Sequence, residues 1–558
     1  MSLATLFRSS QDYVQLNGDL PAQDVAVLRL ILAILLTVYS RYQADGQVYD
    51  WLELDSKTMR PTKFDEQQLA QAAPDELLKT WQQLWQAGHF SPVVTSYLEH
   101  YQDQFDLYSP QHPFGQVTLE QYNQLVPSNK RLDFTKSRVP GRVDIKQINR
   151  LLSESNNKIN VFANRDYQHK NDYTNASLAR WLITYQNYTG KTDKTKVFPK
   201  GGSLGKGWLY NLNPVYAVGQ NLFETLMLNL TLIPQDVPVD LHSLNQQPIW
   251  EQDMYDYVKY RLQKQVPTNL AELYTTPSRL LYFSQAKQAL YAAGYPALDP
   301  SDAFVEPMTT WKLSKNKHEL IPAVRYLNSI NRGMWRNFGQ YVALNNTDSH
   351  RPGIVTWLKF LSQFQYLNAG IHLRTAGFIN DGQPASQMPA AAFSDDLRIQ
   401  ADILFDGDLS NQTTWPAKIE AVIDQTNQVG TYVWHFGKSV ANLRQLADPN
   451  DLARRLESEY YQALNNPFKV WLASLRKTDN VKERLQEWQD QVYLIARQVV
   501  TNQMATATPL DQQGRINEQG ELENIFTFYR RFQRLVYKKL KKEDLFADEW
   551  YLQSTTPD

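Results

Sequence analysis

PAKIEAVIDQTNQVGTYVWHFGKSVANLRQL, residues 416–446, is the stretch of sequence that decides the fold. Apolar side chains recur in it every three or four residues, the period of a helix with one buried face. Pro416 begins the stretch, at a position where proline fits the first turn of a helix. The apolar face consists of Ile419, Val422, Ile423, Val429, Val433, Phe436, Val440 and Leu443.

Three more stretches with this period occupy the rest of the last third of the chain. They are residues 450–476, 481–505 and 518–545, and Pro467 predicts a kink or break in the first of them. Short connections join the stretches, so we expect the four helices to form a four-helix bundle.

The chain before residue 391 is irregular, and its pattern predicts a mixture of short elements. Short apolar runs alternate with Asn, Asp, Pro and Gly, which is typical of strands and loops. Helices are expected near 21–46, 65–104, 214–233, 320–345 and 353–368, and strands near 279–283 and 302–311. We therefore predict an α+β protein, with a large mixed α/β N-terminal domain over residues 1–390 followed by a C-terminal four-helix bundle over residues 391–558.

Composition restricts the possible functions. The chain has 558 residues and no cysteine, which excludes disulfides, thiolate zinc sites and cysteine nucleophiles. Its formal charge of −1 gives no net attraction to nucleic acid, so any such binding must come from local basic patches. The apolar run Val25–Tyr39, with Asp24 as its expected N-cap, is shorter than a bilayer-spanning helix and predicts a buried core helix. The expected location is the cytoplasm, without a membrane.

No pattern of catalytic residues emerges from the sequence. Gly190-Lys191-Thr192 superficially resembles a P-loop, but the first glycine of that motif would fall at Tyr185. The nine histidines form no pair at helical spacing, and the adjacent Asp395 and Asp396 would point apart on a helix. We therefore predict no catalytic residue, no metal site and no cofactor, so that the protein is not an enzyme.

Two segments are conspicuously basic. The loop 186–207 carries five lysines against one acid: Lys191, Lys194, Lys196, Lys200 and Lys206, with Asp193. The last helix has no acid between Glu523 and Glu543 and carries Arg530, Arg531, Arg534, Lys538, Lys539, Lys541 and Lys542. Lysines beside glycines suit a phosphate backbone, although composition alone favours a flexible surface loop. For the helix, a solvated face and a face toward phosphate or a partner protein remain alternatives.

Several ordered blocks of sequence resemble the large subunit (CasA family) of the type I-E CRISPR surveillance complex, Cascade. They are Ser2–Phe7, Phe105-Asp106-Leu107-Tyr108 with His112-Pro113-Phe114, Val161–Asn164, Gln186-Asn187-Tyr188, Gly205–Trp208, Glu306–Trp311 and Gly377–Ser386. The resemblance implies a non-catalytic subunit that recognises the protospacer-adjacent motif (PAM) on duplex DNA, largely from the minor groove. It also implies that the subunit starts strand separation for guide RNA pairing and helps recruit the helicase–nuclease that destroys the DNA. Its partners would be the other Cascade subunits, the guide RNA, target double-stranded DNA and that helicase–nuclease.

The resemblance assigns roles to particular residues. Phe162 and Asn164 are similar to the loop that meets the 5′ end of the crRNA and the backbone subunits. A minor-groove loop is implied for Gly190, Lys191, Thr192, Lys194 and Lys196, in which one glycine remains and lysines replace the others. Lys287 corresponds to a lysine that enters the minor groove. Gln383 resembles the wedge that splits the first base pair, flanked by Asn380, Asp381 and Ala385.

Two other classes of protein are the rivals to this interpretation. A metal-dependent nucleic-acid hydrolase would need clustered Asp and Glu with a His at fixed offsets, which the sequence does not offer. A helical scaffold protein would bind no nucleic acid at all.

Overall fold

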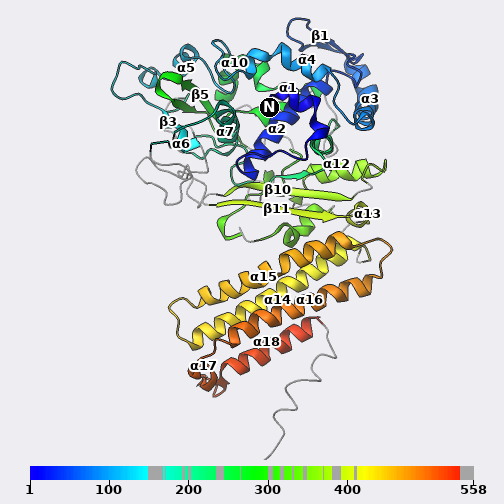
Figure 1. The fold of residues 1–558 in the computed structure, drawn as a ribbon, viewed down its shortest axis with the longest axis vertical. Helices are drawn as coiled ribbons and strands as arrows, with labels where there is room; N and C mark the ends of the chain where they lie inside the picture. Colours follow the sequence, from blue (N-terminus) through cyan, green and yellow to red (C-terminus); the bar gives the residue numbers. More distant parts are fainter. Residues whose placement is uncertain are drawn as a thin grey trace, which may run out of the picture. The chain divides into compact units, whose positions relative to one another are not determined.

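The structure is a computed structural model, and it describes most of the chain. The described residues are 1–148, 168–169, 171–191, 195–198, 203–233, 244–263, 266–299, 306–314, 319–329, 332–342, 349–367, 370–379, 391–407, 411 and 413–540. The chain divides into two compact units (Figure 1). Unit 1 comprises Met1–Ile330, Asn346–Leu367 and Ile371–Asp396; unit 2 comprises Asn331–Asn345, Asn368–Gly370 and Leu397–Asp558. The sequence analysis predicts a single domain boundary, after residue 390. In the structure, the chain passes between the two units more than once.

Unit 1 mixes helices and short strands, and this confirms the predicted α+β class. Its helices are α1 (Leu3–Arg8), α2 (Pro21–Tyr39), α3 (Glu66–Ala87), α4 (Val93–His100), α5 (Leu119–Leu125), α6 (Ile145–Ile148), α7 (Asn175–Tyr188), α8 (Leu222–Asn229), α10 (Met254–Leu262), α11 (Leu270–Thr275) and α12 (Gly353–Ser362). Its strands are β1 (Leu52–Leu54), β2 (Pro61–Phe64), β3 (Arg142–Asp144), β4 (Val215–Ala217), β5 (Arg279–Ser284), β6 (Ala289–Gly294), β7 (Trp311–Leu313), β8 (Leu320–Pro322), β9 (Ser349–His350), β10 (Ile371–Ile379) and β11 (Ala391–Ile399), the last of which runs past Asp396 into unit 2.

Helix α2 is the central helix of unit 1 and packs against α7, α11 and β10. It begins at Pro21, so that Asp24 lies inside the first turn and accepts a hydrogen bond from the backbone N–H of Gly18 at 2.7 Å, instead of capping the helix. Its 19 residues are long and apolar enough to cross a membrane, which corrects the length expected from the sequence. However, 89% of its apolar 18-residue stretch is buried inside this fold, as expected for a core helix.

The sheet β3-β6-β5 separates two apolar clusters, because alternate side chains of a strand point to opposite faces. On one face, Leu280 and Tyr291 pack with residues of α5 and α10. On the other, Leu281 and Leu290 pack with α6 and α7. The rigid β5–β6 hairpin at the centre of this arrangement positions the site described below.

Of two helices predicted before residue 391, the one expected with a short extension at 214–233 is shorter than predicted, and the one at 320–345 is wrong. The stretch 214–233 contains strand β4 and then α8, because the side chain of Asn221 accepts from the backbone of Glu224 and starts a new helix there. The stretch 320–345 contains strand β8 and 3₁₀ segments, the longest being Met334–Tyr341. The strand expected at 302–311 lies partly outside the described residues, and β7 begins at Trp311.

Unit 2 contains the predicted four-helix bundle. Its long helices are α14 (Trp415–Leu443), α15 (Pro449–Ser474), α16 (Val481–Met504) and α18 (Ile525–Leu540), and they run alongside one another in Figure 1. The shorter elements are α13 (Ala401–Leu404), α17 (Pro509–Gln513), β12 (Arg515–Ile516) and β13 (Leu522–Glu523). The β12–β13 hairpin explains why α18 begins at Ile525 and not at residue 518.

Helix α15 continues through Pro467 without the predicted break. Leu464 and Phe468 lie on either side of the proline and are completely buried, so packing in the bundle offsets the lost backbone hydrogen bond. Trp335, from the segment Asn331–Asn345, also packs in the bundle. Its ring stacks on that of Phe468, with the ring centroids 4.5 Å apart.

Candidate nucleic-acid interface

Four of the twelve site residues named from the sequence lie within the described residues: Gly190, Lys191, Lys196 and Lys287. The other eight lie outside them: Phe162, Asn164, Thr192, Lys194, Asn380, Asp381, Gln383 and Ala385. The structure therefore informs the basic loop and the hairpin, while the assignments to the other residues stay predictions.

Arg279, the first residue of β5, holds both ends of the basic loop. Its guanidinium is almost completely buried and donates to the backbone carbonyl of Gly190 and, at 3.0 Å, to that of Gly205. It donates also to the carbonyl of Ser278 at 2.6 Å. A buried guanidinium is stable only when its donors are satisfied, so these carbonyls and Arg279 fix one another. The one remaining glycine of the predicted minor-groove loop, Gly190, is thus a buried residue at the base of the loop.

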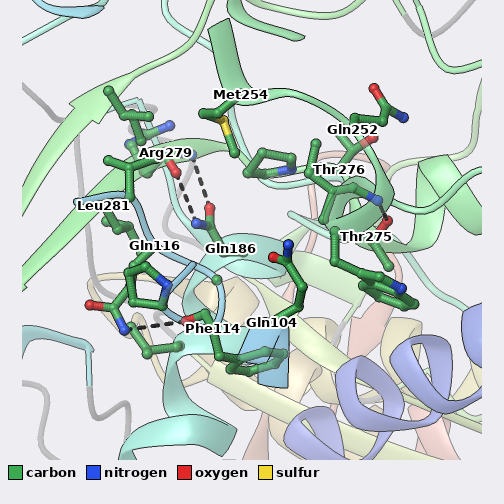
Figure 2. A pocket seen from close by; sticks show the side chains of 18 of the residues that line it. Gln104, Phe114, Gln116, Gln186, Gln252, Met254, Thr275, Thr276, Arg279 and Leu281 are labelled. Atoms are coloured by element: carbon green, nitrogen blue, oxygen red, sulfur yellow. Dashed lines mark hydrogen bonds between the residues drawn. The ribbon is translucent and has the colours of Figure 1, made fainter. Parts of the chain in front are cut away.

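Gln186 fixes the strand that carries Arg279. Its side-chain oxygen accepts from the backbone N–H groups of Ser278 and Arg279, both at 2.9 Å, and its amide nitrogen donates to the carbonyl of Arg279 at 2.8 Å. Figure 2 shows Gln186 facing this backbone. A glutamine that copies the hydrogen bonding of a strand in this way locks the end of α7 onto β5.

The base of the loop closes through backbone contacts. The N–H of Gly207 donates to Thr189 at 2.9 Å, and that of Leu209 donates to Asn187 at 3.0 Å. A Cβ added at Gly207 would lie 2.2 Å from the carbonyl oxygen of Asn187, so only glycine fits there.

The inner part of the loop is attached to the end of β6. The N–H of Val197 donates to Gly294 at 3.1 Å, and that of Gly294 donates to Thr195 at 3.0 Å. The N–H of Gly205 donates to Tyr295 at 2.9 Å. The loop is therefore held on β5 and β6 at several points, unlike the flexible surface loop that its composition favours.

Positive charge accumulates on this fixed loop. Lys191 and Lys206 are exposed. Although the Lys206 side chain as a whole is exposed, protein atoms around its ammonium displace part of its water, and this desolvation, together with the charge of Lys191, lowers the pKa of Lys206. The ammonium of Lys196 lies 5.0 Å from the ring centre of Phe198, and that of Lys206 lies 5.4 Å from that of Tyr210. An anion bound here would relieve the repulsion between the lysines.

Lys287 lies far from the base of the loop. It occupies the exposed turn Gln285–Lys287 between β5 and β6, beside the pair Ser284–Ala289. The loop is attached at the other end of the hairpin, where Arg279 pairs with Gly294. At about 3.3 Å per residue the two ends are roughly 17 Å apart. The structure thus does not bring Lys287 together with the attached part of the loop.

The block Glu306–Trp311 has a structural role. Glu306 and Arg29 are completely buried and form an ion pair at 2.8 Å. The carboxylate also accepts from the hydroxyl of Thr309, and the indole N–H of Trp311 donates to the carbonyl of Glu306 at 3.2 Å. This block therefore fixes α2 to the strand region that follows it.

No group of His, Asp and Glu that could hold a metal ion occurs among the described residues. Asp395 and Asp396 lie on strand β11 and not on a helix, and Asp396 contacts the Nε2 atom of His372 at 3.1 Å. Sequence reasoning named Gln186 only as part of the block Gln186-Asn187-Tyr188, without a role, and it missed Arg279. The one signal available for Arg279 was an arginine at the start of an apolar strand.

Comparison with known proteins identifies the relatives of this chain. The model of the family described as CRISPR-associated protein Cse1 matches residues 1–499. The CRISPR-associated protein CasA/Cse1 of Thermus thermophilus is 24% identical over 346 residues, which cover 59% of this chain and 54% of that protein. The match thus spans about half the length of this curated relative.

Three solved structures show a similar fold. The crystal structure of Thermobifida fusca Cse1 matches with a TM-score of 0.70 at 22% identity, covering 97% of this chain and 94% of that one. Cse1 from Acidimicrobium ferrooxidans matches with a TM-score of 0.64 at 18% identity, covering 97% and 95%. A chain of a structure described as a CRISPR RNA-guided surveillance complex matches with a TM-score of 0.61 at 16% identity, covering 96% and 95%. Because the family model spans most of its length, the chain belongs to the CRISPR-associated Cse1 family.

Proposed function

We propose that this chain is the non-catalytic large subunit of a type I-E Cascade complex. In this role it recognises the PAM on duplex DNA, starts strand separation for guide RNA pairing and helps recruit a helicase–nuclease. Membership of the Cse1 family supports the proposal, as does the likeness to a chain from an RNA-guided surveillance complex. The expected cytoplasmic location stays a prediction.

The observation that carries the proposal is the basic loop held by Arg279. Among the described residues, Lys191, Lys196 and Lys206 belong to a loop base that is tied to β5 and β6, so little ordering of the base is needed when an anion binds. Lysines supply the salt-dependent attraction to phosphate that positions a protein on DNA. Such a loop suits contact with the DNA backbone beside a short motif.

The cationic face of α18 offers a second surface for nucleic acid. Arg530, Arg531, Arg534 and Lys538 are exposed, and none of them has an ion-pair partner within the part of the chain that the structure describes. A merely solvated helix face usually mixes both signs of charge. The uniform sign favours an anionic partner over the scaffold alternative.

The rival reading, a metal-dependent hydrolase, is tested by incubating the purified chain with DNA and Mg²⁺ or Mn²⁺. We expect no cleavage. Metal-dependent cleavage that disappears on substitution of a single Asp or Glu would contradict the non-catalytic assignment.

Reconstitution tests the proposal directly. The remaining Cascade subunits and a guide RNA are assembled with and without this chain, and binding to a matched duplex is measured with an intact and a scrambled PAM. We expect the chain to join the assembly and to confer the preference for the intact PAM. Failure to join, or equal binding to both duplexes, would overturn the proposal.

The loop makes a sharper prediction. Changing Lys191, Lys194 and Lys196 together to Ala should weaken duplex binding on all sequences and reduce the slope of log affinity against log salt by up to about 3. The matched control changes Lys63, Lys79 and Lys259 to Ala, three lysines that are each paired with an acid, and should leave the slope unchanged. A defect confined to PAM-bearing DNA would instead make the loop a sequence reader.

A further inference from the structure

A cavity of about 190 Å³ opens beside β5 in unit 1 (Figure 2). Its polar lining is dominated by carboxamides, namely Gln104, Gln111, Gln116, Gln121, Gln186 and Gln252. These glutamines come from positions scattered over some 150 residues of sequence, and the fold brings them together. We call this cavity the glutamine pocket.

The charged groups of the glutamine pocket are tied to the protein backbone. The guanidinium of Arg279 donates to the carbonyls of Gly190, Gly205 and Ser278. The carboxylate of Asp253 caps α10 by accepting from the backbone of Tyr255 at 2.9 Å and of Asp256 at 3.1 Å. His112 lies on the exposed rim. The buried guanidinium, the one cationic group within the described lining, is therefore already satisfied by backbone carbonyls.

Some carboxamides hold the wall, and others are available. Gln116 donates to the carbonyls of Leu107 at 3.1 Å and Phe114 at 3.2 Å, and these bonds hold the loop 107–116 in its conformation. Gln252 donates its nitrogen to the carbonyl of Gln247 at 3.1 Å, and in Figure 2 its amide points away from Gln104. Within the described residues the side chains of Gln104 and Gln111 make no hydrogen bond, and in Figure 2 the amide of Gln104 points toward the middle of the lining residues.

Apolar and aromatic surfaces complete the lining. Phe114, Met254 and Leu281 line the cavity. The ring of Phe114 is stacked against Phe105 with centroids 5.9 Å apart, and Phe105 contacts Trp250 at 5.1 Å. Phe114 is half-buried and is thus held in place while part of its surface stays open.

This combination fits a flat, uncharged ligand that carries donors and acceptors on its edge. A carboxamide pairs in two places with the edge of a base such as adenine, because it presents a donor and an acceptor side by side. Aromatic side chains stack on any base, since every base has a π-face. We propose that the glutamine pocket binds a nucleobase, with Gln104 contacting its edge and Phe114 its face. The base comes either from a free nucleoside or from an unpaired nucleotide of a nucleic-acid strand.

The experiment uses the purified full chain and distinguishes the two sources. Adenosine, guanosine, cytidine and uridine are titrated by calorimetry, followed by a single-stranded hexanucleotide and by the same strand with an abasic central position. Saturable binding of a nucleoside supports the proposal with a free ligand as the source. Binding of the hexanucleotide that weakens at least 10-fold in the abasic strand supports it with a strand as the source. If no nucleoside binds, and the hexanucleotide either does not bind or binds equally with and without its central base, the proposal is overturned.

Two variants and one crosslink locate the binding. Gln104→Leu and Phe114→Leu should each weaken binding at least 10-fold, whereas Gln68→Leu, on an exposed helix face elsewhere, should leave it unchanged. An unchanged affinity in both pocket variants would overturn the proposal. Because a variant can fail to fold, 4-thiouridine is also crosslinked to the parent chain. Crosslinks to residues 104–116 or 249–254 support the pocket, and crosslinks only elsewhere overturn it. The test needs no Cascade subunit, so its failure would not touch the proposed function.

Discussion

At the scale of single residues, burial decides which charges the fold can use. Glu272 on α11 is almost completely buried, and this burial raises the pKa of its carboxyl from 4.5 to about 7, against the opposing effects of the Thr268 N–H and Arg261. The neutral form is therefore favoured in the folded protein. Ionisation of this group costs folding free energy at the pH of a cell.

The sign of the resulting pH dependence follows directly. Below pH 4.5 the carboxyl is protonated in the folded and the unfolded chain, and it causes no loss of stability. As pH rises through 4.5 and then 7, the unfolded chain releases its proton first, and about 3 kcal/mol of stability is lost. Glu272→Gln should remove this loss. The free energy of unfolding of the variant, relative to that of the parent, should therefore rise between pH 4.5 and pH 8. Urea unfolding at both values measures the difference, and a constant difference would contradict the assignment.

Gln383 also belongs to the residue scale, although it lies outside the described residues. If it is the strand-separating wedge, Gln383→Ala should leave assembly intact and slow R-loop formation on paired DNA. DNA already unpaired beside the PAM should rescue the variant, because unstacking a base step, which costs a few kcal/mol, is no longer needed. Gel-shift kinetics on paired and pre-melted duplexes give the comparison. An equal defect on both would rule out a wedge at this position.

At the scale of elements, α18 offers the clearest test of a charged face. Changing Arg530, Arg534 and Lys538 to Gln removes three exposed charges while the buried Phe528, Phe532 and Val536 stay in place. The slope of log affinity against log salt for the assembled complex should then fall by up to about 3 if all three contact phosphate. Arg454 and Arg484, which are paired with acids, provide the control substitutions to Gln. An unchanged slope would favour the solvated face.

Elements with a strong period were predictable, and those set by distant contacts were not. The apolar stripe of 416–446 gave α14 to within a few residues, because helix period and burial agree there. The helix expected over 320–345 failed, because its residues pair with β7 or contact the bundle, and neither partner is close in sequence. Of the interface, the lysines were visible as a cluster, whereas Arg279 and Gln186 act through a fold that spacing does not reveal.

At the scale of the whole molecule, the segment Asn331–Asn345 joins unit 2 although strands of unit 1 follow it in sequence. Trp335 is its anchor. The ring is almost completely buried, its indole N–H donates to the side-chain oxygen of Asn465 at 3.0 Å, and the neighbouring Arg336 lies 3.4 Å from the ring centre of Tyr461. The core of unit 2 is thus completed by residues that precede it.

Trp335→Ala should therefore destabilise the helical unit. The loss of a buried aromatic ring costs about 3–5 kcal/mol. Hydrogen exchange should show faster opening of α14, α15 and α16, while β5 and β6 of unit 1 keep their protection. Uniform loss of protection in both units would mean that they unfold together. Trp85→Ala in unit 1, whose ring stacks on Trp81, is the matched control and should leave the helical unit protected.

The same segment restricts how this protein can be recombined with its relatives. The chain crosses between the units after residues 330, 345, 367, 370 and 396, so one crossover point cannot exchange the helical unit intact. A chimaera joined only near residue 396 would combine the native Trp335 with a bundle from another protein. That bundle would have to supply a partner in place of Asn465 for the indole N–H. Successful grafts would have to carry 331–345 along with the bundle, and natural recombinants are expected to keep the two segments from the same parent.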